Sequence, residues 1–179
     1  MIEVTIDSIR VSLMTQHRVV ILKDTTNERY LPIWIGPFEA EALTVELQEM
    51  QQQRPFTHDL IKAVIRELGG RVVHVLINDL RNDVFFARIV IEVNDKQIEV
   101  DARPSDAINV AVRAKAPIFV METVLARAGI EPDEDVEQEI ADGEKRAATG
   151  EPVDERRLSA FADFVNSLDL DDLDKEEDN

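Results

Sequence analysis

Apolar and polar residues alternate along the first 13 residues, which is the spacing of a β-strand with one buried face. The alternation changes phase near Asp7 and Ser8, so we expect a bulge or bend there. Two further apolar runs, 18–23 and 29–35, flank a polar tetrad and predict a hairpin. Because Pro32 has no backbone donor, the second strand of this hairpin either lies at a sheet edge or turns Pro32 outward.

Two segments with helical spacing follow. Pro37 suits the first turn of one helix, and Thr57 is a good N-cap for a second helix, which Gly69 and Gly70 end. Apolar residues recur every three or four positions in both segments and predict their buried faces. These residues are Ala40, Leu43, Leu47 and Met50 in the first helix, and Ile61, Val64, Ile65 and Leu68 in the second.

Three strand-like runs come next, at 72–78, 84–93 and 97–102, and they predict an antiparallel meander with loops at 79–83 and 94–96. The last expected elements are a short helix (104–115), a buried strand (118–121) and a second short helix (122–128). Because strand hairpins are interleaved with single helices and no regular strand–helix–strand alternation occurs, the sequence indicates an α+β domain with an antiparallel or mixed sheet over residues 1–130.

Charge divides the chain near residue 130. The sequence has 37 acidic and 20 basic residues, a net charge of −17, but residues 1–130 hold 18 acidic against 15 basic residues, a net charge of only −3. Residues 131–179 carry the other −14 and include few large apolar groups, so we expect an acidic, partly disordered extension. Its apolar residues between Leu158 and Leu168 repeat at helical spacing and predict an amphipathic helix near 154–168, which would dock on the main domain or on a protein partner.

The composition excludes several classes of protein. The sequence has no cysteine, hence no disulfide and no thiolate metal site, and it lacks a Gly-rich phosphate loop, a His-Glu-x-x-His helix and a nucleophile elbow. The longest stretch without a charged residue, 30–38, has nine residues, far below the ~18 that suggest a membrane span. We therefore expect a cytoplasmic protein that does not enter a membrane.

Polar residues gather at three expected helix starts, where free backbone N–H groups and the helix dipole attract anions. The three clusters are Glu39 with Glu41, residues 54–59, and residues 101–106. Each acid taken alone is well explained as a helix cap or as a complement to the dipole. The combination within the third cluster is harder to explain by helix capping alone.

The third cluster places Asp101, Arg103, Ser105 and Asp106 at a strand-to-helix corner. One interpretation is structural: Asp101 and Arg103 form an ion pair along the strand, and the other two residues cap the helix. The other is functional: Arg103 and Ser105 bind a phosphate, while Asp101 and Asp106 hold a divalent cation. The sequence leaves both interpretations open.

His58 is the histidine best placed for chemistry, because Asp59 follows it and Arg54 precedes it closely. An imidazole, a carboxylate and a guanidinium could converge on one phosphodiester, whose hydrolysis needs an activated water, a proton for the leaving oxygen and positive charge near the phosphate. The alternative is a helix-start histidine exposed to water. For the aromatic residues beside these clusters we favour core positions over base stacking: Trp34, Phe38 and Phe56.

These motifs resemble the bifunctional nuclease family. The shared runs are 31–36 followed by Glu39 and Ala40, then 54–60, then 101–107 followed by Arg113 and 117–120. The resemblance spans about residues 1–130, and it implies an oligomeric α+β domain with nuclease activity on both DNA and RNA. Some relatives append a helical hairpin module, and the acidic extension of this chain departs from its pattern.

The leading hypothesis is a nuclease that hydrolyses phosphodiester bonds in DNA and RNA with the help of magnesium or manganese, in a homo-oligomer. The expected catalytic residues are His58, Asp59, Asp101 and Asp106, the substrate-binding residues Arg54, Arg103 and Ser105, and the metal ligands Asp101 and Asp106. The alternative is a non-enzymatic binding or regulatory module whose extension engages a protein partner, which the net charge favours because nucleic-acid binding begins with electrostatic attraction. A third possibility is that the extension mimics a polyanion and occludes the site.

Overall fold

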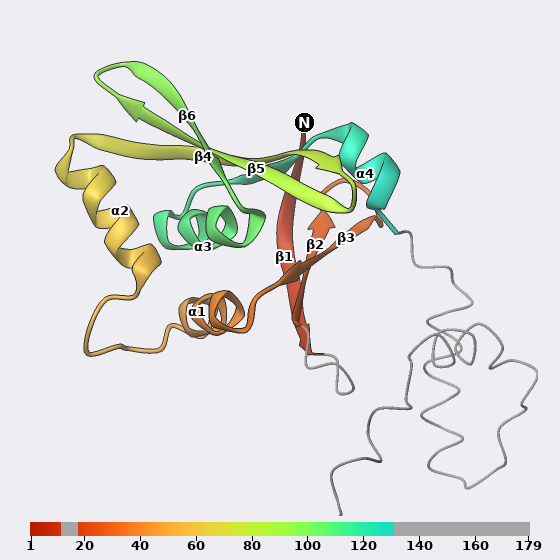
Figure 1. Ribbon diagram of the computed structural model, residues 1–179, viewed down its shortest axis with the longest axis horizontal. Helices are drawn as coiled ribbons and strands as arrows, with labels where there is room; N and C mark the ends of the chain where they lie inside the picture. The colour runs from red at the N-terminus through yellow and green to blue at the C-terminus, as the bar shows by residue number, and fades with distance from the viewer. Residues whose placement is uncertain (12–17, 131–179) are drawn as a thin grey trace, which may run out of the picture. The chain divides into compact units, whose positions relative to one another are not determined.

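The computed structural model describes residues 1–11 and 18–130, which form a seven-stranded sheet and four helices (Figure 1). The strands are β1 (Ile2–Val11), β2 (Arg18–Asp24), β3 (Tyr30–Ile35), β4 (Gly70–Arg81), β5 (Val84–Val93), β6 (Lys96–Ala102) and β7 (Ile118–Val120). The helices are α1 (Pro37–Leu47), α2 (Thr57–Glu67), α3 (Pro104–Ala114) and α4 (Glu122–Ala128). The α+β prediction is confirmed, whereas the helix expected near 154–168 lies outside the described residues.

The sheet is mixed, with the strand order β3-β2-β1-β7-β4-β5-β6. Strand β1 joins its two halves, because it pairs with β7 at its start and with β2 along the rest of its length. The register of β1 shifts between Ile6 and Ser8, which confirms the predicted bulge. Strand β3 lies at one edge, as its proline predicts, since an edge strand tolerates a missing donor.

Strands β4, β5 and β6 form the predicted antiparallel meander, but with tighter turns than expected. Each connection is a two-residue turn, Asn82-Asp83 and Asn94-Asp95, and all four residues have positive φ between 48° and 61°. Asn and Asp tolerate this left-handed backbone, and two such residues in a row match the twist of a hairpin. The strands therefore run into the segments expected as loops, and β4 continues to Arg81.

Helix α3 is the centre of the helical layer. It contacts β4 and β5 on one side and α1 and α2 on the other, so most of its residues are buried. Helix α4 packs instead against β3 and β4. None of the helices in the described part of the chain is long and apolar enough to cross a membrane.

The buried faces predicted for α1 and α2 are partly wrong. Met50 lies beyond the end of α1, and Leu47 is 44% exposed at its last turn. In α2, Val64 and Leu68 face solvent, whereas His58 is the buried residue of this helix. The reason is that α2 packs mainly on α3 and β4, and Val64 and Leu68 lie on the side of the segment that faces solvent.

The core assignment of two aromatic residues is also wrong. Trp34 is 64% exposed and Phe38 is 81% exposed, whereas Phe56 is half-buried. In β3 the alternate residues Leu31, Ile33 and Ile35 fill the core, and this sends the indole of Trp34 to the opposite face. The alternation of side chains along the strand therefore exposes Trp34, although its side chain is hydrophobic.

Candidate functional site

The N-terminal ends of α1, α2 and α3 meet around one pocket of about 310 Å³, here called the helix-start pocket. Its lining residues are Phe38, Glu39, Glu41 and Ala42 from α1, Phe56, Thr57 and His58 from the start of α2, and Arg103 and Asp106 from the start of α3. Pro37 and Pro104 occupy the first positions of α1 and α3, where the fixed φ of proline favours the beginning of a helix. Local sequence therefore determines where these helices begin, and packing on α3 brings their ends together.

The Arg103 side chain links the starts of α1 and α3. Its Nε donates a hydrogen bond to Asp106 Oδ2 at 2.8 Å, and its Nη2 donates to Glu39 Oε1 at 2.7 Å and to Asp106 Oδ1 at 3.1 Å. The side chain of Arg103 is nevertheless 65% exposed. A guanidinium that is held from one side and open on the other is well suited to bind an anion.

His58 lies beside Asp106 and is almost completely buried. Its Nε2 is 3.2 Å from Asp106 Oδ1, and its side chain is 8% exposed. Its Nδ1 is buried and has no hydrogen-bond partner within residues 1–11 and 18–130. The water-exposed interpretation of His58 is therefore excluded, and Nε2 is the ring nitrogen that can exchange a proton with Asp106.

These contacts also set the ionisation of the pocket. Burial raises the pKa of Asp106, but hydrogen bonds from Arg103 and His58 outweigh burial and hold this pKa below its ordinary value. The hydrogen bonds to Asp106 and Glu39 raise the pKa of Arg103. At neutral pH the pocket thus holds a permanent cation next to an ionised Asp106.

Asp59 holds the scaffold of the pocket together. Its Oδ2 accepts a hydrogen bond from the backbone N–H of Phe56 at 2.8 Å, and its Oδ1 accepts one from Arg113 Nε at 2.9 Å. Arg113 is 2% exposed and also donates to Asn109 Oδ1 and to the carbonyl of Ala42, each at 2.9 Å. Asp59 does not line the helix-start pocket, and its contacts are those of a residue that positions α2 against α3.

Asn109 is a second positioning residue, and the sequence analysis missed it. It is fully buried, and its Nδ2 donates to the backbone carbonyls of Glu39 and Ser105, each at 3.0 Å. The available signal was the polar pair Asn109 and Arg113, four residues apart among mostly apolar buried residues of α3. A buried polar pair of this kind must find partners, and here the partners are backbone carbonyls of α1 and α3 and the side chain of Asp59 in α2.

The remaining predicted site residues do not line the helix-start pocket. Arg54 is exposed and borders a neighbouring hollow of about 250 Å³. Ser105 is buried in the first turn of α3. Asp101 is exposed on β6, and because Ala102 packs toward the core, the Asp101 side chain lies on the opposite face of the sheet.

The sequence predicted Glu39 only as an acid at a helix start. In the structure it is one of the two carboxylates that accept hydrogen bonds from Arg103. Its carboxylate folds back over Gly36, where a Cβ atom would lie 2.2 Å from Glu39 Oε2. Glycine at this position therefore leaves the space that the Glu39–Arg103 contact requires. The sequence signal was Gly36 directly before Pro37, the first residue of α1.

The donor set does not fit the divalent-cation site expected from Asp101 and Asp106. Both carboxylate oxygens of Asp106 already bond to Arg103 or His58, and Asp101 lies on a different face of the sheet. Within the described residues, no group of three or more His, Asp or Glu side chains is arranged to hold a metal ion.

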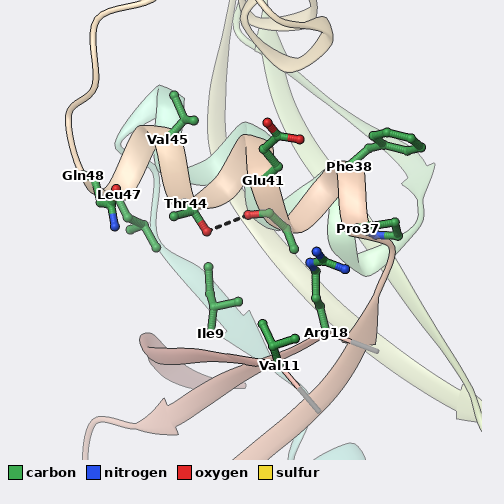
Figure 2. A pocket seen from close by; sticks show the side chains of 11 residues that line it. Ile9, Val11, Arg18, Pro37, Phe38, Glu41, Thr44, Val45, Leu47 and Gln48 are labelled. Atoms are coloured by element: carbon green, nitrogen blue, oxygen red, sulfur yellow. Dashed lines mark hydrogen bonds between the residues drawn. The ribbon is translucent and has the colours of Figure 1, made fainter. Parts of the chain in front are cut away.

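A larger hollow of about 740 Å³ lies between α1 and the strands β1 and β2 (Figure 2). Figure 2 shows Ile9 and Val11 pointing toward α1, and most of the side chains that line this groove are apolar. It shares Phe38 and Glu41 with the helix-start pocket and is also lined by Arg18, but its lining includes no histidine. The pairing of an imidazole with a carboxylate is therefore a feature of the smaller pocket.

Comparison with known proteins covers the part of the chain that forms the helix-start pocket. The model of the bifunctional nuclease domain matches residues 20–133, a range that contains the whole helix-start pocket. The chain belongs to the bifunctional nuclease domain family. This confirms the resemblance inferred from the motifs of the sequence.

Relatives of the family extend to bacteria and plants. The chain is 40% identical over 172 residues to an uncharacterised protein of Mycobacterium tuberculosis, which is 96% of this chain and 97% of that protein. It is 31% identical over 131 residues to bifunctional nuclease 2 of Oryza sativa subsp. japonica, which is 72% of this chain and 40% of the rice protein. It is 32% identical over 108 residues to bifunctional nuclease 2 of Arabidopsis thaliana, which is 58% of this chain and 33% of the plant protein.

Proposed function

We propose that this chain is a nuclease that hydrolyses phosphodiester bonds in DNA and RNA, and that the helix-start pocket is its active site. The observation that carries the proposal is the exposed Arg103 guanidinium beside the paired His58 and Asp106, where three helix N-termini converge. Membership of the bifunctional nuclease domain family and the names of the plant relatives support the same reaction class.

Arg103 supplies the positive charge. Its Nε and Nη2 already donate to Asp106 and Glu39, so the N–H groups of Nη1, which have no acceptor among the described residues, donate to the phosphate oxygens. As water attacks phosphorus, negative charge accumulates on the equatorial oxygens, and a fixed cation next to them lowers the barrier. The hydrogen bonds to Glu39 and Asp106 hold the guanidinium in place before substrate arrives.

Asp106 and His58 transfer the protons. The attacking water loses a proton to the Asp106–His58 pair while its oxygen forms the new bond to phosphorus. The bond between phosphorus and the leaving oxygen then breaks, and that oxygen takes the proton from the pair, which returns to its starting state. The contact between His58 Nε2 and Asp106 Oδ1, 3.2 Å in length, lets one proton be shared between them.

The test uses purified protein with end-labelled single-stranded DNA and RNA, in magnesium, in manganese and in excess EDTA. We expect Arg103→Ala and Asp106→Asn each to lower the rate by about 10²-fold or more, the scale of losing one charge-stabilising group. Arg66→Ala is the matched control, because Arg66 is exposed and pairs only with Glu67 among the described residues. Equal rates for all four proteins, wild type included, would attribute the activity to a contaminant.

Asp101→Ala separates two versions of the mechanism. If the helix-start pocket acts alone, this variant keeps its activity, because Asp101 does not line the pocket. A loss of activity that excess manganese restores would instead support the cation pair of Asp101 and Asp106. The EDTA arm decides metal dependence independently of either variant.

One observation supports a second candidate function, a non-enzymatic binding module. Three carboxylates line the pocket, from Glu39, Glu41 and Asp106, against one guanidinium, so the local charge opposes a phosphate. In this case labelled oligonucleotides are bound weakly or not at all, and no turnover occurs in any metal. The same assay, run with a binding readout, distinguishes the two functions.

A further inference from the structure

Strand β6 leaves one edge of the sheet open. It is the last strand in the order, and no described strand pairs with its outer side. Six of its seven residues are exposed, including two large apolar ones, Ile98 at 49% and Val100 at 41%. Exposed edges with apolar residues readily pair with another chain unless they are protected.

The other edge of the same sheet is protected. Strand β3 carries Pro32, which cannot donate to a further strand, and Tyr30 forms a bridge with Ile130. Strand β6 has no proline, and its pairing with β5 shows no bulge. The β6 edge therefore lacks the proline and the strand bridge that protect the β3 edge, and its charged residues Lys96, Glu99 and Asp101 leave its backbone groups open to pairing.

The turn before β6 determines which backbone groups face outward. In a two-residue hairpin the flanking residues, here Val93 and Lys96, form a hydrogen-bonded pair, and bonded and non-bonded pairs then alternate along the ladder. The pairing with β5 is regular through Ala102. The backbone N–H and C=O groups of Gln97, Glu99 and Asp101 therefore point to the open edge.

We propose that a second copy of this chain pairs with this edge, through an antiparallel β6–β6 contact whose two-fold axis passes by Glu99. In this register Gln97 lies opposite Asp101 of the partner, and Glu99 lies opposite its own copy. It is the register in which all three outward-facing residues find partners, whereas a shift by two residues loses one pair. Ile98 then lies opposite Val100 of the partner, twice, which covers the exposed apolar side chains.

The charges of this contact are balanced within each copy. Two glutamates directly opposite each other repel, which is unfavourable in a sheet. Arg88 on the neighbouring strand β5 forms an ion pair with Glu99 in each copy. The centre of the interface therefore holds two arginine–glutamate pairs, and Arg88→Ala is expected to weaken the dimer.

Cysteine cross-linking tests the register, because the chain has no cysteine of its own. Residues in a hydrogen-bonded antiparallel pair have Cα atoms about 5.5 Å apart, but their Cβ atoms are farther apart than a direct disulfide prefers, so a short thiol-to-thiol cross-linker is used. With this reagent and dilute protein, Glu99→Cys is expected to give a covalent dimer, whereas Gln97→Cys alone is not. The double variant Gln97→Cys/Asp101→Cys is expected to cross-link again. Equal cross-linking of both single variants, or none in Glu99→Cys, overturns the proposal.

Light scattering of the full chain tests the dimer itself. We expect twice the 20.3 kDa chain mass for the wild type, and the monomer mass for Glu99→Pro. Proline at this position removes only an outward-facing N–H, so the hairpin with β5 is retained. Leu60→Asp is the control, because it changes an exposed apolar residue of α2 instead. A wild-type monomer, as expected if another segment of the same chain covers β6, or dissociation by Leu60→Asp but not by Glu99→Pro, overturns the proposal.

Discussion

Replacing Arg113 by methionine removes the buried charge that joins the three helices of the helix-start pocket. The guanidinium donates to Asp59 of α2, to the carbonyl of Ala42 in α1, and to Asn109 within α3. Methionine keeps most of the volume of the side chain but donates no hydrogen bond. The perturbation therefore tests whether these polar contacts, and not packing alone, hold the helix starts together.

The expected loss in the free energy of unfolding comes from the buried acceptors that the substitution leaves without a donor. The carbonyl of Ala42 and the Oδ1 atom of Asn109 lose a donor in the interior, and each buried acceptor without a partner costs about 1–3 kcal/mol. The side chain of Asp59 is 33% exposed, so water compensates part of its loss. Methionine recovers some free energy by filling the apolar space, and we expect a net loss of about 3 kcal/mol, at the lower end of the cost of breaking a buried pair.

Urea unfolding followed by far-UV circular dichroism measures this loss, with Arg66→Met as the matched control. Arg66 is exposed and pairs only with its neighbour Glu67 within the described chain, so its replacement is expected to cost less than about 0.5 kcal/mol. A loss below about 1 kcal/mol for Arg113→Met would refute the reasoning, because the polar contacts would then contribute little beyond packing.

Three further outcomes follow from the contacts of single residues. Gly36→Ala places a methyl group where the Glu39 carboxylate lies, so in nuclease assays it should change the KM as Glu39→Ala does. The double variant should have the same KM as either single variant, because both substitutions remove one contact. Burial raises the pKa of Asp24, but hydrogen bonds from the turn that follows outweigh burial and hold this pKa well below its ordinary value. The ionised carboxylate of Asp24 therefore stabilises the folded state above about pH 4, and this contribution is lost as the pH falls through the lowered pKa. Thermal melts should therefore show that Asp24→Asn is less stable at pH 7 and that its Tm falls less between pH 7 and pH 3 than that of the wild type; a parallel fall would contradict this. Asn94→Val puts a β-branched residue at a φ of 50° and should cost about 1–3 kcal/mol in urea unfolding, whereas no loss would show that the turn relaxes.

The sequence predicted the elements well because their causes are local. Alternation of apolar residues placed the strands, and the change of phase placed the bulge in β1. Proline at the first position marked the start of α1 and α3, and glycine shortly after the last turn marked the end of α2 and α4. The turns were tighter than expected because the composition of a loop does not reveal that two consecutive residues adopt positive φ, as Asn82 and Asp83 do.

The faces of the helices and the members of the site depended on packing, which the sequence does not contain. Spacing alone gave α2 a single buried stripe, but α2 touches the domain along one flank, and His58 takes the innermost position. Glu39 and Arg103 are 64 positions apart, and no local pattern indicates that they bond. Asn109 and Arg113 were the strongest missed signal, since polar residues on the inner face of a helix require partners.

The corner between β6 and α3 shows most clearly why proximity along the chain misleads. Asp101 and Asp106 are five residues apart, and one interpretation of the sequence was a shared cation, because both are acids at one corner. In a strand, however, successive side chains point to opposite faces, and the inward position of Ala102 places Asp101 on the outer one, while the first turn of α3 carries Asp106 to His58. In the proposed dimer Asp101 lies opposite Gln97 of a second copy, so one acid of the motif would serve assembly and the other the chemistry of the pocket. Asp101→Pro distinguishes the two roles, because it removes the outward-facing backbone donor of Asp101 and should weaken the dimer, while Asp101 does not line the pocket and the activity should be kept.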